Sequence, residues 1–275
     1  MSNSIVRALS GTGFVLVMLF CLLFSKFTYG VLILLIMVGM MVEFYRMTMG
    51  DSYLISRILA IVSAVSLFVL IFCSAAFGMA LKFVALAMML ILMIMVNSLY
   101  VKDKSEFGRF SNIYTALLYI AAPMALSNLI VFQHGMYSGV LLICFFIIIW
   151  ASDIGAYTFG IALGKRFPKK LFETISPKKT WVGYWGGLFM AIVAACILYY
   201  TGFMKFPLIH CVVLSAVMHI AGVWGDLFES QWKRFYNVKD SGNIIPGHGG
   251  LLDRFDSTLM AMPIGAVYLA IFNLL

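Results

Sequence analysis

Long runs of apolar residues follow one another along the whole chain and are separated by short polar segments. Most runs approach the roughly 20 residues that a helix needs to cross the hydrocarbon core of a bilayer. Apolar residues within a run are consecutive rather than alternating, which favours helices over the strands of a membrane barrel. We therefore predict about nine spanning helices, near residues 8–25, 29–42, 56–76, 78–96, 113–132, 139–162, 182–201, 207–225 and 255–274.

Composition and charge refine this picture. Hydrophobic residues make up 63% of the 275 positions and charged residues only 11%, whereas about 25% of residues are charged in a typical soluble domain. If the N-terminus is cytoplasmic, 16 of the 19 Lys and Arg residues fall in inner segments and 3 in outer loops, as the positive-inside rule requires. The sequence thus predicts an all-α, polytopic transmembrane helix bundle with a cytoplasmic N-terminus and a C-terminus outside.

The chain is predicted to form one integral membrane unit with two regions. Residues 1–135 contribute N-terminal transmembrane helices, and residues 136–275 form a C-terminal region with cytoplasmic loops at 163–181 and 226–254. The net charge of +8 would by itself fit nucleic acid, anionic lipid headgroups or acidic substrates. The topology already explains much of this charge, and we expect no nucleic-acid partner. The residues suited to chemistry lie in the second region.

Asp153 is the first of these residues, because it lies inside a predicted span. A carboxylate within a membrane is costly and usually faces the interior of the bundle or a water-filled cavity. Ser152, Gly155 and Tyr157 surround it in the sequence with small or polar side chains. A packing role beside a lysine is the simpler alternative. The polar surroundings favour a functional role, either in an ion pathway or as a metal ligand.

A second candidate is the motif Ser176-Pro177-Lys178-Lys179-Thr180, which lies directly before the predicted span at 182–201. Two lysines and two hydroxyls at the entrance of a helix suit a phosphate, because cations, hydroxyl donors and backbone N–H groups converge there. Lysines are equally expected in a basic cytoplasmic loop. This motif alone therefore leaves both interpretations open.

The third candidate runs from Asp226 to Asp256 and holds five carboxylates. On a helix Asp226, Glu229 and Lys233 share one face, and Glu229 and Lys233 form an i,i+4 pair. Asp253 and Asp256 are spaced i,i+3 at the start of the last predicted span, so both carboxylates point the same way. Carboxylate clusters without His or Cys ligands favour hard cations, Mg²⁺ above all, which commonly also binds substrate phosphates.

A glycine-rich loop interrupts this acidic segment, with the sequence Pro246-Gly247-His248-Gly249-Gly250. Glycines permit positive φ and a close approach of the backbone, so the loop is suited to cradle phosphate oxygens. Lysines and arginines nearby would neutralise the remaining phosphate charge. The combination indicates a site for Mg²⁺ and a phosphorylated substrate rather than a solvated loop.

The same residues resemble the signature of a known family, the phosphatidate cytidylyltransferases or CDP-diacylglycerol synthases. The resemblance is strong from about residue 145 to 257, and the N-terminal half is similar only in its hydrophobicity. The Asp153 region and the motif at 176–181 occur in the same order as in that family. The positions that carry the signature are Ser230, Lys233, Arg234, Lys239, Asp240, Pro246, Gly247, His248, Gly249, Gly250, Asp253, Arg254, Phe255 and Asp256.

The resemblance implies a reaction in phospholipid biosynthesis. A cytidylyl group would pass from CTP to phosphatidic acid, giving CDP-diacylglycerol and pyrophosphate. The resemblance also implies Mg²⁺ as a cofactor, with K⁺ as a further cation, and a homodimer surrounded by membrane lipids. It implies the plasma membrane of a bacterium, with the active site facing the cytoplasm.

Residue roles follow from the pattern together with the resemblance. We expect Asp226 and Asp253 as the principal metal ligands, with Asp256 and Asp153 as further ligands or as residues that orient them. Asp226, Asp253 and Lys233 are the expected catalytic residues. Both reactants are anionic, so catalysis is mainly charge neutralisation and positioning. The residues expected to bind substrate are Ser176, Lys178, Lys179, Thr180, Ser230, Arg234, Lys239, Gly247, His248, Gly249, Gly250 and Arg254.

Two alternatives remain open at this point. A CTP-dependent enzyme that acts on another lipid phosphate or on a lipid alcohol would use the same residues. An ion-coupled transporter would use Asp153 as its coupling carboxylate. The transporter is the weaker alternative, because no inverted repeat is evident and most charged residues lie in loops rather than at the membrane midplane.

Overall fold

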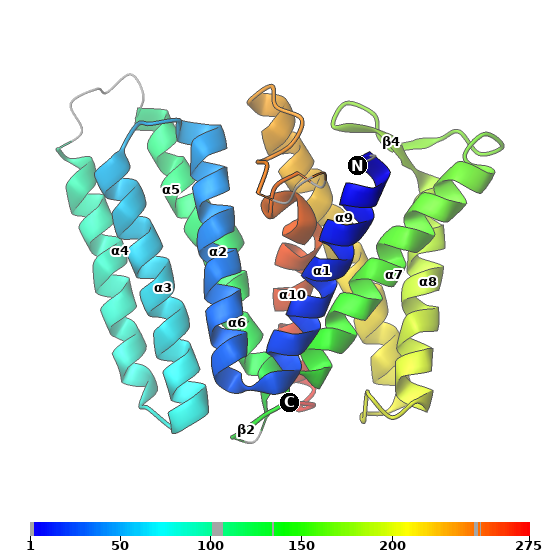
Figure 1. Ribbon diagram of the computed structural model, residues 1–275, viewed down its shortest axis with the longest axis horizontal. Helices are drawn as coiled ribbons and strands as arrows, with labels where there is room; N and C mark the ends of the chain where they lie inside the picture. Colours follow the sequence, from blue (N-terminus) through cyan, green and yellow to red (C-terminus); the bar gives the residue numbers. More distant parts are fainter. Residues whose placement is uncertain (1–2, 101–106, 134, 245–246, 248) are drawn as a thin grey trace. The chain divides into compact units, whose positions relative to one another are not determined.

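The computed structural model describes residues 3–100, 107–133, 135–244, 247 and 249–275. This part of the chain consists of helices and two short antiparallel hairpins (Figure 1). The hairpins pair β1 (Phe132–Gln133) with β2 (Met136–Tyr137) and β3 (Lys170–Phe172) with β4 (Ser176–Thr180). The helices are α1 (Asn3–Phe24), α2 (Lys26–Met49), α3 (Leu54–Phe77), η1 (Leu81–Val84), α4 (Ala85–Ser98), η2 (Phe107–Phe110), α5 (Ser111–Ala116), the π-helix η3 (Leu117–Ala121), α6 (Ala122–Val131), α7 (Val140–Leu163), α8 (Trp181–Tyr200), α9 (Leu208–Phe235) and α10 (Leu252–Ile271).

These helices confirm the predicted all-α, polytopic architecture. Within the described residues, seven helical segments are long and apolar enough to cross a membrane. The first predicted span corresponds to α1, whose apolar stretch Leu9–Phe24 is shorter, and the last corresponds to α10. The seven longer segments are Lys26–Met49, Leu54–Phe77, Leu81–Ser98, Phe107–Val131, Val140–Leu163, Trp181–Tyr200 and Leu208–Phe235. The count of nine crossings and the orientation of the termini stay predictions.

The chain divides into two compact units. The first contains Met1–Ser138 and Tyr236–Arg254, and the second contains Gly139–Phe235 and Phe255–Leu275. Helix α10 therefore begins in the first unit and continues in the second. The segment 236–254, which the sequence suggests is a loop of the C-terminal region, packs with the N-terminal helices.

Helix α2 packs against α1, α3 and α5 in the first unit. It begins with a capping box, in which the Ser25 hydroxyl accepts from the Thr28 backbone N–H and the Thr28 hydroxyl accepts from the Ser25 N–H. Such a box satisfies backbone donors that the first turn of a helix leaves unpaired. Further along, the Tyr29 hydroxyl bonds the Ser127 hydroxyl of α6 at 2.6 Å. These contacts fix the position of α2, which carries the buried Glu43 in its last two turns.

Small residues set the packing in the second unit. A side chain at Gly155 of α7 would overlap Gly186 and Met190 of α8, and one at Gly183 would overlap the Ala156 carbonyl. Small residues of this kind let the backbones of membrane helices approach closely. Helices α7 and α8 are therefore held together along a glycine-lined face, directly beside Asp153 and the β4 strand.

Candidate active site

A cavity of about 510 Å³ lies in the second unit, among α7, β4, α8, α9 and the second turn of α10. Asp153, Lys178, Lys179, Thr180 and Asp226 give it a charged, polar part. The sequence places these five residues in three separate motifs, and the fold brings them together. The remaining lining residues include the apolar side chains Ala156, Ile161, Leu171 and Val223.

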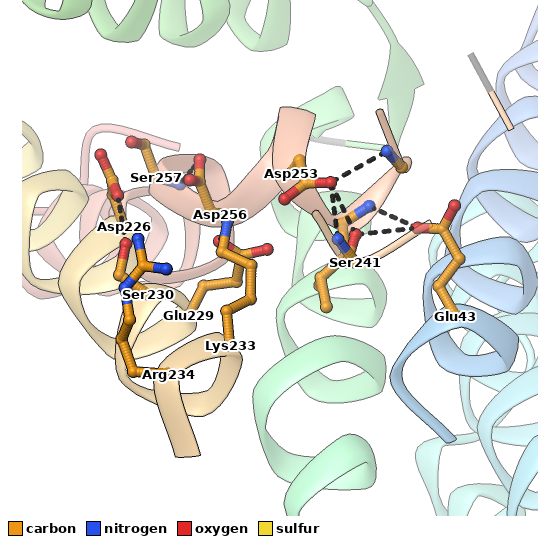
Figure 2. Close-up of polar contacts among 12 residues, drawn as sticks. Glu43, Asp226, Glu229, Ser230, Lys233, Arg234, Ser241, Asp253, Asp256 and Ser257 are labelled. Carbon is orange, nitrogen blue, oxygen red and sulfur yellow. Dashed lines mark hydrogen bonds and ion pairs between the residues drawn. The ribbon is translucent and has the colours of Figure 1, made fainter. Parts of the chain in front are cut away.

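An ion pair joins two elements at this cavity. The Lys179 Nζ of β4 lies 2.5 Å from the Asp226 Oδ2 of α9, and both side chains are partly exposed. The Ser230 hydroxyl donates to the other oxygen of Asp226, Oδ1, at 3.3 Å (Figure 2). Asp226 is thus oriented by one residue one turn further along its own helix and by a cation from the hairpin. Lys179 therefore lines the cavity, and its role in binding phosphate stays a prediction.

Thr180 accounts for the position of Lys178 and Lys179 directly before α8. Its Oγ1 accepts a hydrogen bond of 3.2 Å from the Gly183 backbone N–H, which makes it the N-cap of α8. Threonine is a favoured residue at this position because its side chain satisfies a donor of the first helical turn. Lys178 and Lys179 therefore stand immediately before a helix N-terminus, whose partial positive charge also favours anions.

Four carboxylates interact electrostatically in the second unit. Asp256 experiences the charges of Asp226, Glu229 and Asp153. The close approach of α9 and α10 produces this arrangement, because a side chain at Gly225 would overlap the Asp256 carbonyl oxygen. Asp256 Oδ1 also accepts from the Ser257 N–H at 2.6 Å (Figure 2). Like charges held at such proximity require a cation or a proton for stability.

Glu229 and Lys233 form the predicted i,i+4 ion pair on α9. The Glu229 side chain is 1% exposed and that of Lys233 12% exposed. Lys233 therefore neutralises a buried carboxylate, and its catalytic role stays a prediction. The neighbouring Arg234 donates from Nε to the Ile175 carbonyl at 3.4 Å, which links the end of α9 to the β3–β4 hairpin.

Asp253 belongs to the first unit, where its carboxylate holds the glycine-rich loop. Its Oδ2 accepts from the Ser241 N–H, the Ser241 hydroxyl and the Gly250 N–H, each at 2.9 Å (Figure 2). Gly249 adopts φ +86°, a left-handed conformation that favours glycine, and a side chain there would crowd the same oxygen. Asp253 thus has a structural role in addition to the metal ligation predicted for it.

For most of the remaining predicted site residues, the structure shows only their degree of exposure. Lys239, Gly247 and Arg254 are exposed, and Ser176 is partly buried in β4. His248 lies outside the described residues. Within the described part of the chain, no group of three or more His, Cys, Asp or Glu side chains is arranged so that it could hold a metal ion. The predicted metal-binding and substrate-binding roles therefore remain predictions.

Sequence reasoning missed one residue that touches the signature segment, Glu43 of α2. Its carboxylate accepts from the Ser241 hydroxyl and the Leu252 N–H. The only signal in the sequence is an acidic residue at the end of an apolar run. An acidic residue near a predicted cytoplasmic loop is not unusual, so no local pattern connects Glu43 to Ser241 and Leu252, about 200 positions later.

The fold and the cavity define a class: an integral membrane protein with a charged cavity suited to a phosphorylated, partly apolar ligand. Sequence comparison is more specific. A sequence model of the cytidylyltransferase family matches residues 5–272, and the chain belongs to this family. The phosphatidate cytidylyltransferase of Bacillus subtilis is 38% identical over 192 residues, which are 68% of each chain. Enzymes of the same name from Staphylococcus aureus strain COL and Staphylococcus haemolyticus are 44% and 40% identical over 121 and 119 residues, in each case 43% of this chain and 45% of the relative.

Proposed function

We propose that this protein transfers a cytidylyl group from CTP to phosphatidic acid, with CDP-diacylglycerol and pyrophosphate as products. Membership of the cytidylyltransferase family and the names of the bacterial relatives support this activity. The structural observation that carries the proposal is the cavity in which Lys178, Lys179, Asp153 and Asp226 meet.

The cavity fits both parts of a lipid phosphate. Its lysines and the adjoining N-terminus of α8 suit phosphate oxygens. Ile161, Leu171 and Val223 line the same cavity with apolar surface, which suits the glycerol and the first carbons of acyl chains. A water-soluble phosphate ester would leave this apolar surface without a partner.

The reaction needs charge neutralisation more than proton transfer. An oxygen of the phosphatidate phosphomonoester attacks the α-phosphorus of CTP, a new P–O bond forms, and the bond from the α-phosphorus to the oxygen bridging to the β-phosphorus breaks. The phosphomonoester is already anionic near neutral pH, so a general base is not needed. Lys178 and Lys179 would bind phosphate oxygens, which reduces the repulsion between the two anionic reactants.

The carboxylates fit a divalent cation by their chemistry. Asp153, Asp226 and Asp256 offer hard oxygen donors from α7, α9 and α10, and Asp256 experiences the other two charges. Within the described residues these three side chains are not arranged as a complete metal site, so we propose that they hold Mg²⁺ only together with substrate phosphate oxygens. The bound ion would neutralise phosphate charge during transfer. Asp226 and Asp253 belong to different units, so their joint ligation stays a prediction. K⁺ and a homodimer remain expectations of the family resemblance.

The proposed location follows from the substrates. CTP is a cytosolic nucleotide, and the distribution of Lys and Arg puts the 163–181 and 226–254 segments on the cytoplasmic side. The named relatives are bacterial. We therefore propose that the protein lies in a bacterial plasma membrane with its active site facing the cytoplasm.

The decisive experiment measures pyrophosphate release and the lipid product from CTP, using the purified full chain in lipid nanodiscs. We expect release only when phosphatidic acid and Mg²⁺ are both present, and loss of release on chelation that Mg²⁺ reverses. The Lys179→Met variant should lose most of this activity. Lys205→Met, which removes an exposed lysine from the loop before α9, is the matched control and should retain it.

The acceptor distinguishes the proposal from its nearest alternative. Lipid alcohols and other lipid phosphates are offered in place of phosphatidic acid at equal mole fraction. Faster turnover with one of them would show that this lipid, rather than phosphatidic acid, accepts the cytidylyl group. Absence of pyrophosphate release with every acceptor would overturn the proposed function.

A further inference from the structure

Glu43 occupies an unusual position for an acidic residue in a membrane protein. It lies in α2, only 2% of its surface is exposed, and its surroundings in the helix are the buried Met40, Met41, Phe44 and Tyr45. Burial of a carboxylate is costly unless hydrogen bonds compensate for the lost water. The hydrogen-bond partners of Glu43 therefore indicate its role.

Those partners are the two ends of the glycine-rich segment. Glu43 Oε2 accepts from the Leu252 N–H, the first residue of α10, at 2.9 Å, and contacts the Ser241 hydroxyl at 3.3 Å. Ser241 also bonds Asp253 Oδ2 through both its N–H and its hydroxyl. Two carboxylates, one from α2 and one from α10, thus converge on Ser241 (Figure 2).

The glycines of the segment fit the Glu43 carboxylate as well. A side chain at Gly242 would overlap Glu43 Oε1 and Cδ, and one at Gly250 would overlap Glu43 Oε2 and the Ser241 hydroxyl. Neither glycine has a positive φ, so the space beside Glu43, rather than the backbone conformation, requires glycine here. Glu43 Oε1 is buried and has no hydrogen-bond partner, so only small groups can approach it without further crowding.

We propose that Glu43 is a positioning residue that fixes Ser241 and the start of α10 at Leu252 for nucleotide binding. The hydrogen bond to Leu252 sets where α10 begins, and the contact with Ser241 sets the opposite end of the loop. The role in nucleotide binding rests on the proposed function and on the phosphate-cradling role that the sequence predicts for the glycine-rich loop. The holding of the loop rests only on the hydrogen bonds and the glycine packing. A function is thereby given to the N-terminal helices, whose contribution the sequence left unassigned.

Hydrogen exchange tests the holding of the loop without any substrate. Peptides covering residues 240–252 are followed by mass spectrometry in the purified full chain, in wild type and in Glu43→Ala. We expect exchange in this segment to become about tenfold faster or more, because a lost hydrogen bond leaves the loop free to open. Gly242→Ala, which crowds the carboxylate without removing its charge, should accelerate exchange in the same peptides. Asp51→Asn, at an exposed acid just after α2, should not.

Kinetics test the consequence for the nucleotide. In Glu43→Ala we expect the KM for CTP to rise about tenfold, with the KM for phosphatidic acid unchanged, whereas Glu43→Gln, whose amide oxygen can still accept from Leu252, should stay closer to wild type. Should Glu43→Ala fail to accumulate as folded protein, Gly242→Ala, which crowds the same carboxylate, supplies both readouts. Unchanged exchange at 240–252 in a folded variant would overturn the proposal. Faster exchange in a protein whose wild type lacks cytidylyl transfer would overturn the proposed function and leave the holding of the loop standing.

Discussion

Lys179 and Asp226 form an ion pair at the cavity, with 2.5 Å between Nζ and Oδ2, although they come from a β-hairpin and from the middle of a long helix. Each belongs to a motif that the sequence singled out separately. Their contact brings a phosphate-binding motif and a carboxylate motif to one place. The pair is partly exposed, so its role is better sought in binding and catalysis than in stability.

Asp226→Asn should abolish most turnover while leaving the fold intact. The variant removes the negative charge that orients Lys179 and that we assign to Mg²⁺ binding. We expect kcat to fall about 10²–10³-fold, as when an electrostatic stabiliser of a transition state is removed. Size-exclusion chromatography and thermal unfolding serve as the test of folding, and Glu173→Gln in the exposed hairpin turn is the control. A kcat near that of wild type would refute the assignment.

Lys233→Met should destabilise the protein, because it leaves Glu229 buried without its cation. Loss of one partner of a buried ion pair costs about 3–5 kcal/mol. The double variant Glu229→Gln with Lys233→Met should recover most of that stability in a thermal or chemical unfolding assay. Activity then separates two roles. If the stabilised double variant is inactive, Lys233 or Glu229 also acts in the reaction; if it is active, the predicted catalytic role of Lys233 is wrong.

Gly225→Ala should lower stability and activity together. Its methyl group would overlap the Asp256 carbonyl oxygen, where α9 and α10 meet. Insertion of a methyl group into a packed contact costs about 1–3 kcal/mol, and here it would also displace Asp256 from Asp226. Gly13→Ala in α1 is the control, because open space surrounds that position. Alanine is the better helix former, so a lower melting temperature for Gly13→Ala than for Gly225→Ala would contradict the argument.

Thr180→Ala should weaken the start of α8. The change removes the acceptor for the Gly183 N–H, and loss of a threonine N-cap costs about 1 kcal/mol. Because Lys179 precedes the cap, we also expect a higher KM for the phosphorylated substrates. Thr180→Ser retains the acceptor and should behave as wild type in both the melting temperature and the KM. Equal effects of alanine and serine would show that the methyl group, not the hydrogen bond, matters.

The helices were predictable because apolar run length alone identifies a membrane span. Each predicted span corresponds to a helix or a helical segment, including the short second run, which lies within α2. The hairpin at β3–β4 was not predicted, because its residues are polar and too few to show the alternation of a strand. The weak break predicted between the third and fourth spans coincides with the end of α3, where Gly78 adopts a left-handed conformation.

The candidate site was predictable in its residue types but not in its contacts. The spacing of Glu229 and Lys233 predicted their ion pair, because one helix fixes that geometry. The i,i+3 spacing of Asp253 and Asp256 placed both on α10 but could not show that Asp253 Oδ2 receives three hydrogen bonds from the loop. Contacts of that kind depend on tertiary packing, on which a local pattern carries no information.

The grouping of residues 236–254 with the N-terminal helices has a consequence for how such chains can diverge. A fragment that starts at residue 139 would keep nearly every signature residue yet lack the helix that contacts Ser241 and Leu252. Chimeras between relatives, joined near residue 138, should therefore work only when position 43 and the 241–252 segment descend from compatible parents. The contacts of Glu43 with Ser241 and Leu252 therefore couple the N-terminal helices to the signature segment, so substitutions in one constrain those in the other.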